Sequence, residues 1–206
     1  MTSSEAWLAE PNHAVSDAAL DTLLREAHTT RKWLEKPVSP ALLMAIYDLM
    51  RWGPTAANIT PARIVFVVSK EAKEKLKPHL DAGNVRQTME APVTAILGYD
   101  LDFARHLPAL YKASPDALNW FSDADSNKII ALRNGSLQGG YFILAARALG
   151  LDCGPMGGFS HDGIDADFFA GTQIRSNFLC NLGYGAPGGT RPRDARLAFD
   201  QACEIL

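Results

Sequence analysis

Apolar residues recur at helical spacing in three parts of the chain, which predicts helices over residues 17–27, 40–52 and 129–149. The second helix opens with Ser39-Pro40, an N-cap followed by proline at the first helical position. The third ends at Gly150 and carries Gln138-Gly139-Gly140 near its middle. Residues this small indicate that another helix or a ring packs closely there.

Continuous apolar runs predict buried strands at residues 62–68, 93–99 and 177–183, and a shorter strand is expected just before Gly154. Runs that are continuous rather than alternating are typical of strands covered on both faces. Shorter helices are expected at residues 85–90 and 164–169. The alternation of helices with buried strands indicates an α+β or α/β sandwich.

Two segments between these elements have a different character. Residues 70–79, capped by Ser69, predict a charged helix that faces water, because Ala72 and Leu76 are its apolar members. Residues 101–126 contain prolines and aromatic residues without a helical or strand period, and we expect them to be irregular. A stretch of that length inside a compact domain is usually functional or a lid.

The composition fits one globular domain. The chain has 206 residues, 47% of them hydrophobic and 21% charged, and we assign all of residues 1–206 to one domain, with about 1–15 as an N-terminal extension. The net charge is −3 and no basic stripe is present, so nucleic acid is not an expected partner.

Cysteine and histidine usage indicates a reduced setting without a metal site. The three cysteines lie far apart, and the five histidines are scattered, so no zinc-like spacing occurs. The first twenty residues lack a basic segment followed by an apolar one, and the longest apolar helical run is too short to cross a bilayer. We therefore expect a cytoplasmic protein with no membrane partner.

Two distant loops carry the main candidate chemistry. Residues 51–63 place a Gly-Pro turn, three small residues and Asn58 between a helix and a strand. Such a loop lets backbone and an amide approach a planar ligand closely, although it also fits an ordinary helix-to-strand connection. Residues 154–159, Gly-Pro-Met-Gly-Gly-Phe, have the same character a hundred residues later.

Two further patterns do not support their usual functions. Residues 183–188 match G-x-G-x-x-G, but the prolines and glycines that follow leave no room for the helix and strand of a dinucleotide fold. Ser160-His161-Asp162 places three hydrolase residue types side by side, and neighbours in sequence rarely converge as a triad does.

Basic residues form two sets that lie far apart in sequence. They are either solvated surface charge or, if the sets converge, a cationic pocket suited to a phosphate, because guanidinium groups bind phosphate through paired hydrogen bonds. The sets are His28, Arg31 and Lys32 after the first helix, and Arg191, Arg193 and Arg196 near the C-terminus.

From about residue 27 to 206 the order and spacing of several short motifs resemble those of FMN-dependent nitroreductases. The sequence most resembles the subfamily assigned as malonic semialdehyde reductases of pyrimidine degradation. The matching motifs include Trp33-Leu34, Lys36-Pro37-Val38, Gly53-Pro54-Thr55-Ala56-Ala57-Asn58, Pro61-Ala62-Arg63, Ala91-Pro92-Val93, Gly154-Pro155-Met156, Ser176-Asn177 and Leu182-Gly183-Tyr184-Gly185.

The resemblance implies an α+β nitroreductase-like fold, with a central mixed β-sheet flanked by helices in an interlocked homodimer. Two FMN molecules are expected at the subunit interface, each touched by both chains. The expected cofactor-binding residues are His28, Thr30, Arg31, Lys32, Arg193 and Arg196 at the phosphate, Asn58 with Pro54, Thr55 and Ala56 at the pyrimidine edge, and Pro155, Met156, Gly157 and Gly158 along the ring. The catalytic contact is expected to be a backbone N–H of Gly157 at flavin N5.

The implied activity is ping-pong hydride transfer from NADH or NADPH, through FMN, to a small electrophile. The expected acceptor is malonic semialdehyde, which gives 3-hydroxypropionate, and Arg63, Arg133 or Trp120-Phe121 are candidate substrate contacts. A broad nitroaromatic or quinone reductase and a non-catalytic flavin-binding protein are the alternatives. Three positions depart from the family pattern: His28 stands where Arg is usual, Thr60 where Gln is usual, and Gly157 where many relatives have a larger residue.

Overall fold

The computed structural model describes residues 14–206, so the expected N-terminal extension lies almost wholly outside the described residues. At its centre is a four-stranded sheet in the order β1-β2-β4-β3. The strands are β1 (Ala62–Val67), β2 (Val93–Asp100), β3 (Asp152–Met156) and β4 (Ile174–Gly183).

All three strand pairings are antiparallel, so the expectation of a mixed sheet is wrong for these four strands. Outside these strands, Thr29 and Cys153 form an isolated parallel bridge. The N-terminal segment therefore touches the β3 edge at one point instead of adding a full parallel strand.

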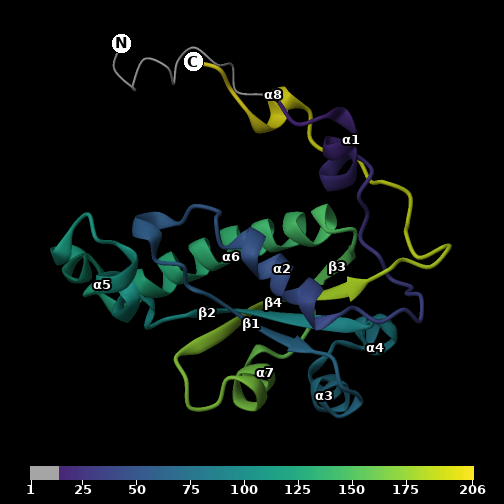
Figure 1. Ribbon diagram of the computed structural model, residues 1–206, viewed down its shortest axis with the longest axis horizontal. Helices are drawn as coiled ribbons and strands as arrows, with labels where there is room; N and C mark the ends of the chain where they lie inside the picture. Colours follow the sequence, from purple (N-terminus) through teal and green to yellow (C-terminus); the bar gives the residue numbers. More distant parts are fainter. Residues whose placement is uncertain (1–13) are drawn as a thin grey trace.

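Helices cover both faces of the sheet (Figure 1), which confirms the α+β class. α2 (Pro40–Met50) and α6 (Ala124–Ala148) lie on one face, and α3 (Lys70–Leu76), α4 (Ala82–Glu90) and α7 (His161–Phe168) lie toward the other. Side chains of the central strand β2 alternate between the two layers. Ala95 and Leu97 pack in the core with α2 and α6, and Ile96 packs in the core on the other face, with α3 and α7. Because β2 is buried on both sides, its sequence is mostly apolar without an alternating pattern, and its polar members Thr94 and Asp100 are paired.

Hydroxyl and carboxylate caps fix where several helices begin. Side-chain oxygens of Ser39, Ser69, Asp123 and Ser160 each accept a backbone N–H from the third residue of the helix that follows. Caps of this kind stabilise a helix by about 1 kcal/mol each. The predicted starts at Ser39-Pro40 and Ser69 are therefore confirmed.

Residues 101–126 were predicted to be irregular, and this prediction is wrong. They hold a 3₁₀ turn (Phe103–His106), α5 (Leu107–Leu110), a second 3₁₀ segment (Pro115–Phe121) and the first turn of α6. Their prolines stand at helix N-terminal positions, where no intrahelical N–H is needed, so they start short helices instead of breaking one. Phe103 and Leu107 pack these turns into a small separate core.

The small residues of α6 have different neighbours. A Cβ built on Gly139 would lie 2.5 Å from a ring carbon of Phe178, whereas nothing lies within 4 Å of one built on Gly140. The expected close packing of a ring is confirmed at Gly139.

α3 is more buried than its sequence predicted. It was expected to face water, but Leu76 is fully buried and Lys73 is only 5% exposed. At the two ends of the described chain, α1 (Asp17–Leu20) and α8 (Phe199–Ala202) stand away from the sheet (Figure 1).

Candidate functional site

The two basic sets converge. His28 and Arg31 from the N-terminal segment line a cavity of about 390 Å³ together with Arg191, Arg193 and Arg196 from the C-terminal segment. Arg147 of α6 joins them, and Asp194 is the acidic residue of the lining. We call this space the arginine cavity. The alternative that both sets are merely solvated surface charge is not supported by this arrangement.

The charge of the arginine cavity is largely uncompensated. Within residues 14–206, none of its five arginines forms an ion pair. Their bonds go to carbonyl oxygens instead, such as Arg193 Nη2 to Ala27 O at 2.8 Å and Arg147 Nη1 to Leu23 O at 2.8 Å. Each guanidinium has five donors, so most remain available to an anion.

Other members of the predicted phosphate set have structural positions. Thr30 is buried, and its backbone N–H donates to Cys153 O at 2.9 Å. The carbonyl of Lys32 accepts the N–H of Ala186. The Lys32 side chain is exposed and is not part of the lining of the arginine cavity. The N-terminal segment is thus held against β3 and the loop after β4.

A second pocket adjoins the arginine cavity. This space of about 350 Å³, which we call the β3 pocket, is lined by Pro155 and Met156 of the β3 end and by Asn84, Arg86 and Gln87 of α4. It shares Thr29, Arg31 and Arg191 with the arginine cavity. A cationic end therefore continues into a pocket that combines apolar side chains with amide groups.

The loop that follows β3 packs closely against α4. The Gly158 carbonyl accepts Asn84 Nδ2 at 2.8 Å and the Asp81 N–H at 3.2 Å. A Cβ on Gly158 would lie 2.6 Å from an Asp81 carboxylate oxygen and 2.8 Å from Asn84 Nδ2, so a side chain here would displace the Asp81 and Asn84 side chains. Gly157 is exposed, and a Cβ there would meet nothing within 4 Å. The structure thus leaves one face of Gly157 open beside the β3 pocket.

The other predicted loop opens on a different space. Pro54 and Asn58 line a cavity of about 740 Å³ beside β1, which we call the β1 cavity. In this loop Ala57, Asn58 and Thr60 all have positive φ, at 45°, 53° and 38°. Non-glycine residues rarely adopt this conformation, and such strain concentrates at functional sites, where surrounding contacts enforce it.

Polar side chains of α6 hold this strained loop. Asn134 Oδ1 accepts the Ala56 N–H at 2.9 Å, Gln138 Oε1 accepts the Ala62 N–H at 2.8 Å, and Tyr141 donates to the Pro54 carbonyl at 3.1 Å. Positions 134, 138 and 141 share one helix face. The sequence analysis did not identify this stripe, although its polar i, i+4, i+7 pattern in a mostly buried helix was a visible signal.

Within one chain the two predicted loops lie at opposite edges of the sheet. The first loop precedes β1 and the second follows β3, which are the outer strands in the order β1-β2-β4-β3. Three inter-strand spacings separate them, roughly 14 Å. Each chain therefore presents two separate loop cavities instead of one enclosed slot.

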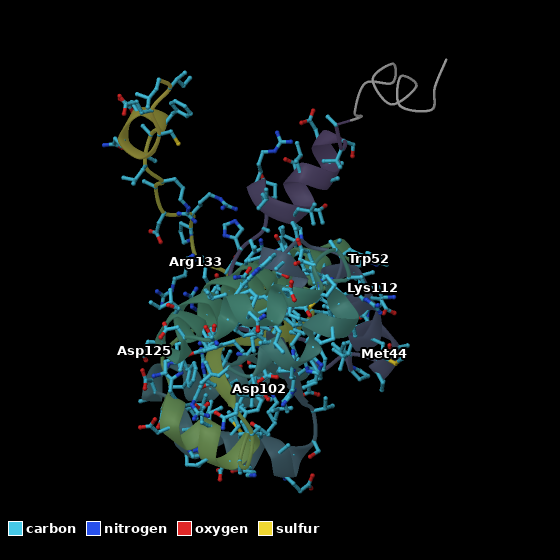
Figure 2. All side chains as sticks on the ribbon, turned by 90° about the vertical axis from the view of Figure 1, so that its left-hand side faces the viewer. Met44, Trp52, Asp102, Lys112, Asp125 and Arg133 are labelled. Atoms are coloured by element: carbon cyan, nitrogen blue, oxygen red, sulfur yellow. The ribbon has the colours of Figure 1, made fainter. Side chains whose placement is uncertain are left out.

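The candidate substrate residues are dispersed. Arg63 lines the β1 cavity, but its guanidinium pairs with buried Asp100 at 2.8 Å and donates to Thr60 O at 3.0 Å. Phe121 packs edge-on against Phe103, 5.1 Å between ring centres, and Trp120 against Tyr111 at 5.9 Å. Arg133 lies on the exposed surface of α6 (Figure 2). The structure does not bring these four residues together.

Neither Ser160-His161-Asp162 nor the G-x-G-x-x-G match at residues 183–188 forms the site that its pattern suggests. Ser160 caps α7 by accepting the Gly163 N–H, while His161 contacts Ser176 instead. Gly183 ends β4, and residues 184–198 contain no helix. Over the described range no group of three or more metal-ligating side chains is close enough to hold an ion. None of the helices there combines the length and apolarity that a membrane span requires.

Known proteins resemble this chain in sequence and in fold. Residues 24–184 match the model of the nitroreductase family. A protein of Stenotrophomonas maltophilia (strain K279a), provisionally named NADH dehydrogenase/NAD(P)H nitroreductase, is 59% identical over 195 residues, 94% of this chain and 99% of that protein.

Two solved structures share the fold at low identity. One, provisionally described as a nitroreductase and solved in complex with FMN, comes from Exiguobacterium sibiricum 255-15; its TM-score is 0.80 at 19% identity, covering 95% of this chain and 100% of that one. The other is an enone reductase of a gut-bacterial fatty acid saturation metabolism, with a TM-score of 0.80 at 17% identity, covering 94% of this chain and 100% of that one. The match over residues 24–184 and the 59% identity show that this chain belongs to the nitroreductase family.

Proposed function

We propose that the protein is an FMN-dependent NAD(P)H oxidoreductase. The observation that carries this proposal is the arginine cavity running into the β3 pocket, with Thr29, Arg31 and Arg191 common to both. Membership of the nitroreductase family, the NAD(P)H in the name of the 59% identical relative and the FMN in one structural neighbour support the same cofactors.

The residues present fit FMN. A phosphate is a doubly charged anion, and the arginine cavity offers several guanidinium groups without carboxylate partners. Pro155 and Met156 offer apolar surface to a flat ring, and beside them the Asn84 and Gln87 amides bond to Gly158 O and to each other, which fixes the polar wall of the pocket. We assign the phosphate to His28, Arg31, Arg193 and Arg196, and the ring to residues 155–158.

The family chemistry depends on the cofactor. When bound, FMN would supply the hydride chemistry between NAD(P)H and a small electrophile, with the two substrates using the site in ping-pong order. The protein orients the ring, and we assign the N5 contact to the backbone N–H of Gly157. Its open face fits this role, because no side chain of residue 157 occupies the approach.

We propose further that each cofactor site is completed by a second copy of the chain. The loop carrying Pro54, Thr55, Ala56 and Asn58 opens on the β1 cavity, across the sheet from the β3 pocket. In a homodimer, this loop of one chain reaches the ring bound by the other. Exposed apolar residues support such an interface: Trp52 is 81% exposed and lies on the same side of the molecule as exposed Met44 (Figure 2).

For the electron acceptor we propose malonic semialdehyde, reduced to 3-hydroxypropionate in pyrimidine degradation, on the sequence resemblance described above. Arg63 is a weaker carboxylate contact than the sequence implied, because Arg63, Arg105, Asp100 and Asp102 form a paired cluster without net charge. A broad nitroaromatic or quinone reductase is the second candidate, favoured by the relative's name. A non-catalytic flavin protein is the third, favoured by His28 and Thr60.

The absorption spectrum of the purified protein tests the proposal. We expect a flavin spectrum, released cofactor that is FMN, and bleaching of the visible band by NADH or NADPH without oxygen. Colourless protein that takes up no added FMN contradicts both enzyme functions. A flavin spectrum that neither nicotinamide bleaches favours the non-catalytic protein.

Turnover of the bleached protein with different acceptors separates the two enzymes. Malonic semialdehyde and a nitroaromatic are added separately at equal concentrations, and reoxidation is followed at the flavin band. Faster reoxidation by the semialdehyde supports the first assignment, and the reverse order supports the broad reductase.

A further inference from the structure

Lys73 of α3 has a buried amine without an acidic partner. Its Nζ donates to the Thr88 carbonyl at 2.7 Å and to Thr94 Oγ1 at 2.6 Å. No carboxylate of residues 14–206 pairs with it. Burial lowers the pKa of this amine from its ordinary value of 10.5 to about 7. Burying an amine is costly unless its donors are satisfied, and two of the Lys73 donors are bonded here.

The first of these bonds holds the end of α4. Thr88 O is one of the last four carbonyls of the helix, which have no partner within it. The neighbouring carbonyl, Gln87 O, accepts Trp33 Nε1 at 3.0 Å. A donor at this end also interacts favourably with the helix dipole. Lys73 and Trp33 together therefore anchor the C-terminal turn of α4.

The second bond starts a directed chain of donors that ends at the β3 pocket. Thr94 Oγ1 donates to Asn181 Oδ1 at 2.7 Å, and Asn181 Nδ2 donates to Thr88 Oγ1 at 3.3 Å. Thr88 Oγ1 in turn donates to the sulfur of Met156 at 3.5 Å. Met156 lines the β3 pocket, so the chain connects a buried amine to the pocket wall.

α4 makes a further contact with the same loop, near its other end. Asn84 Nδ2 donates to Gly158 O at 2.8 Å, and Gln87 Nε2 orients the Asn84 side chain through a 2.7 Å bond. The Met156 side chain and the Gly158 carbonyl therefore both bond to α4, and the end of α4 is held by Lys73. Gly157, which we assigned to the flavin contact, lies between these two attachment points.

We propose that Lys73 is a positioning residue for the flavin-facing loop: by anchoring α4 and the Thr94–Asn181–Thr88 chain, it sets the place of Met156 and Gly158 and hence of the Gly157 N–H. The inference rests on the proposed function where it assigns this loop to the flavin. The hydrogen bonds themselves do not depend on that assignment.

Hydrogen exchange of the flavin-free protein tests the mechanical part. Lys73→Met keeps the length of the side chain and removes its donors, and Lys70→Met, at an exposed position of the same helix, is the control. We expect amides of residues 156–160 to exchange about tenfold faster in Lys73→Met and unchanged in Lys70→Met. Unchanged exchange of these amides in folded Lys73→Met overturns the proposal.

A second pair of variants serves if Lys73→Met does not fold. Thr88→Val removes the hydroxyl that contacts Met156 but leaves the backbone carbonyl that Lys73 holds, and Thr88→Ser keeps the hydroxyl. Faster exchange of residues 156–160 in Thr88→Val, but not in Thr88→Ser, supports the proposal. Equal exchange in both overturns it.

Flavin binding tests the functional part. We expect Lys73→Met to raise the dissociation constants of FMN and riboflavin equally, by about tenfold, and to shift the visible absorption band of the bound flavin. A general loss of stability does not shift that band. Unchanged affinity and an unchanged band overturn the positioning role. If the wild-type protein binds no flavin, the proposed function fails, while the exchange experiment still shows whether Lys73 holds the loop.

Discussion

Positive side chains have two different environments in this molecule. Arg193 and Arg196 lie exposed at the arginine cavity, where water and a ligand both reach them. Lys73 is enclosed and bonds to uncharged oxygens. The first environment suits the capture of an anion. The second fixes the position of neighbouring groups, since a desolvated amine is tolerated only when its donors are satisfied.

Arg196→Ala should discriminate between two flavins. Only FMN carries the phosphate that we assign to the arginine cavity, so its affinity should fall by about tenfold or more while riboflavin affinity stays the same. Flavin fluorescence titration measures both. Lys112→Ala, at an exposed position on another part of the surface (Figure 2), is the charge-matched control. Equal weakening of FMN and riboflavin would place Arg196 away from the phosphate.

Lys73 should make stability depend on pH above neutrality. The pKa of the amine is about 7 when folded and 10.5 ordinarily. Between these values the unfolded chain holds a proton that the folded chain has released, so stability rises with pH through this window. The slope approaches about 1.4 kcal/mol per pH unit. The difference in unfolding free energy between wild type and Lys73→Met, from urea titrations at pH 7 and 9, should grow accordingly. A constant difference contradicts the lowered pKa.

Lys73 shows what a residue-by-residue reading of the sequence missed. It stands three positions before Leu76, and residues at this spacing share a helix face. That spacing was the available signal. The charge pattern favoured a solvated helix because lysine is rarely buried, and only the packing of α3 against α4 and the sheet reverses this expectation.

At the scale of elements, α6 does more than cover the sheet. Its polar stripe of Asn134, Gln138 and Tyr141 supplies hydrogen-bond partners to a loop whose backbone is strained. Because the helix is long and its own backbone bonds are satisfied internally, it is a rigid platform for that loop. Loop geometry is therefore set by a helix more than seventy residues away in sequence.

Gln138→Met should destabilise the protein by leaving the Ala62 N–H without its acceptor. Gln138 is buried, and an unsatisfied buried donor costs about 1–3 kcal/mol. Urea unfolding measures the change, and Arg133→Gln, exposed on the same helix, is the control. An unfolding free energy equal to that of the control would show that water or another group replaces the Gln138 oxygen.

Elements were predictable where local signals were strong. Serine caps and apolar periodicity located α2 and α3, and apolar runs located β2 and β4, within a few residues of their observed ends. Residues 101–126 were not predictable in this way. Their short helices lack a full apolar period and depend on packing around Phe103 and Leu107.

At the scale of the whole molecule, one chain has separate cavities at the two edges of its sheet. The arginine cavity and β3 pocket lie at one sheet edge, and the β1 cavity at the other. The C-terminal segment, with Leu197 70% exposed and Phe199 63% exposed, runs away from the body (Figure 1). A segment of this kind has apolar surface that a second copy of the chain can cover.

We expect Leu197→Asp combined with Phe199→Asp to shift a dimer toward monomer, because charge is costly in a buried apolar interface. Sedimentation velocity of wild type and variant measures the shift, and Glu204→Gln in the same exposed segment is the control. The variant should also bind FMN less tightly, since in the proposed dimer each site is completed by the partner's loop. An unchanged dimer with unchanged flavin content would place the interface elsewhere.

The sequence by itself determined the domain's class, most of its helices and strands, the family resemblance and the residue types suited to an anion and a flat ring. These follow from local periodicity, capping chemistry and the order of motifs along the chain. Tertiary structure alone decided that the basic sets meet, that the two small-residue loops lie at opposite sheet edges, and that Lys73 is buried. Each of these depends on strand order and helix packing, which bring together residues that no local pattern relates.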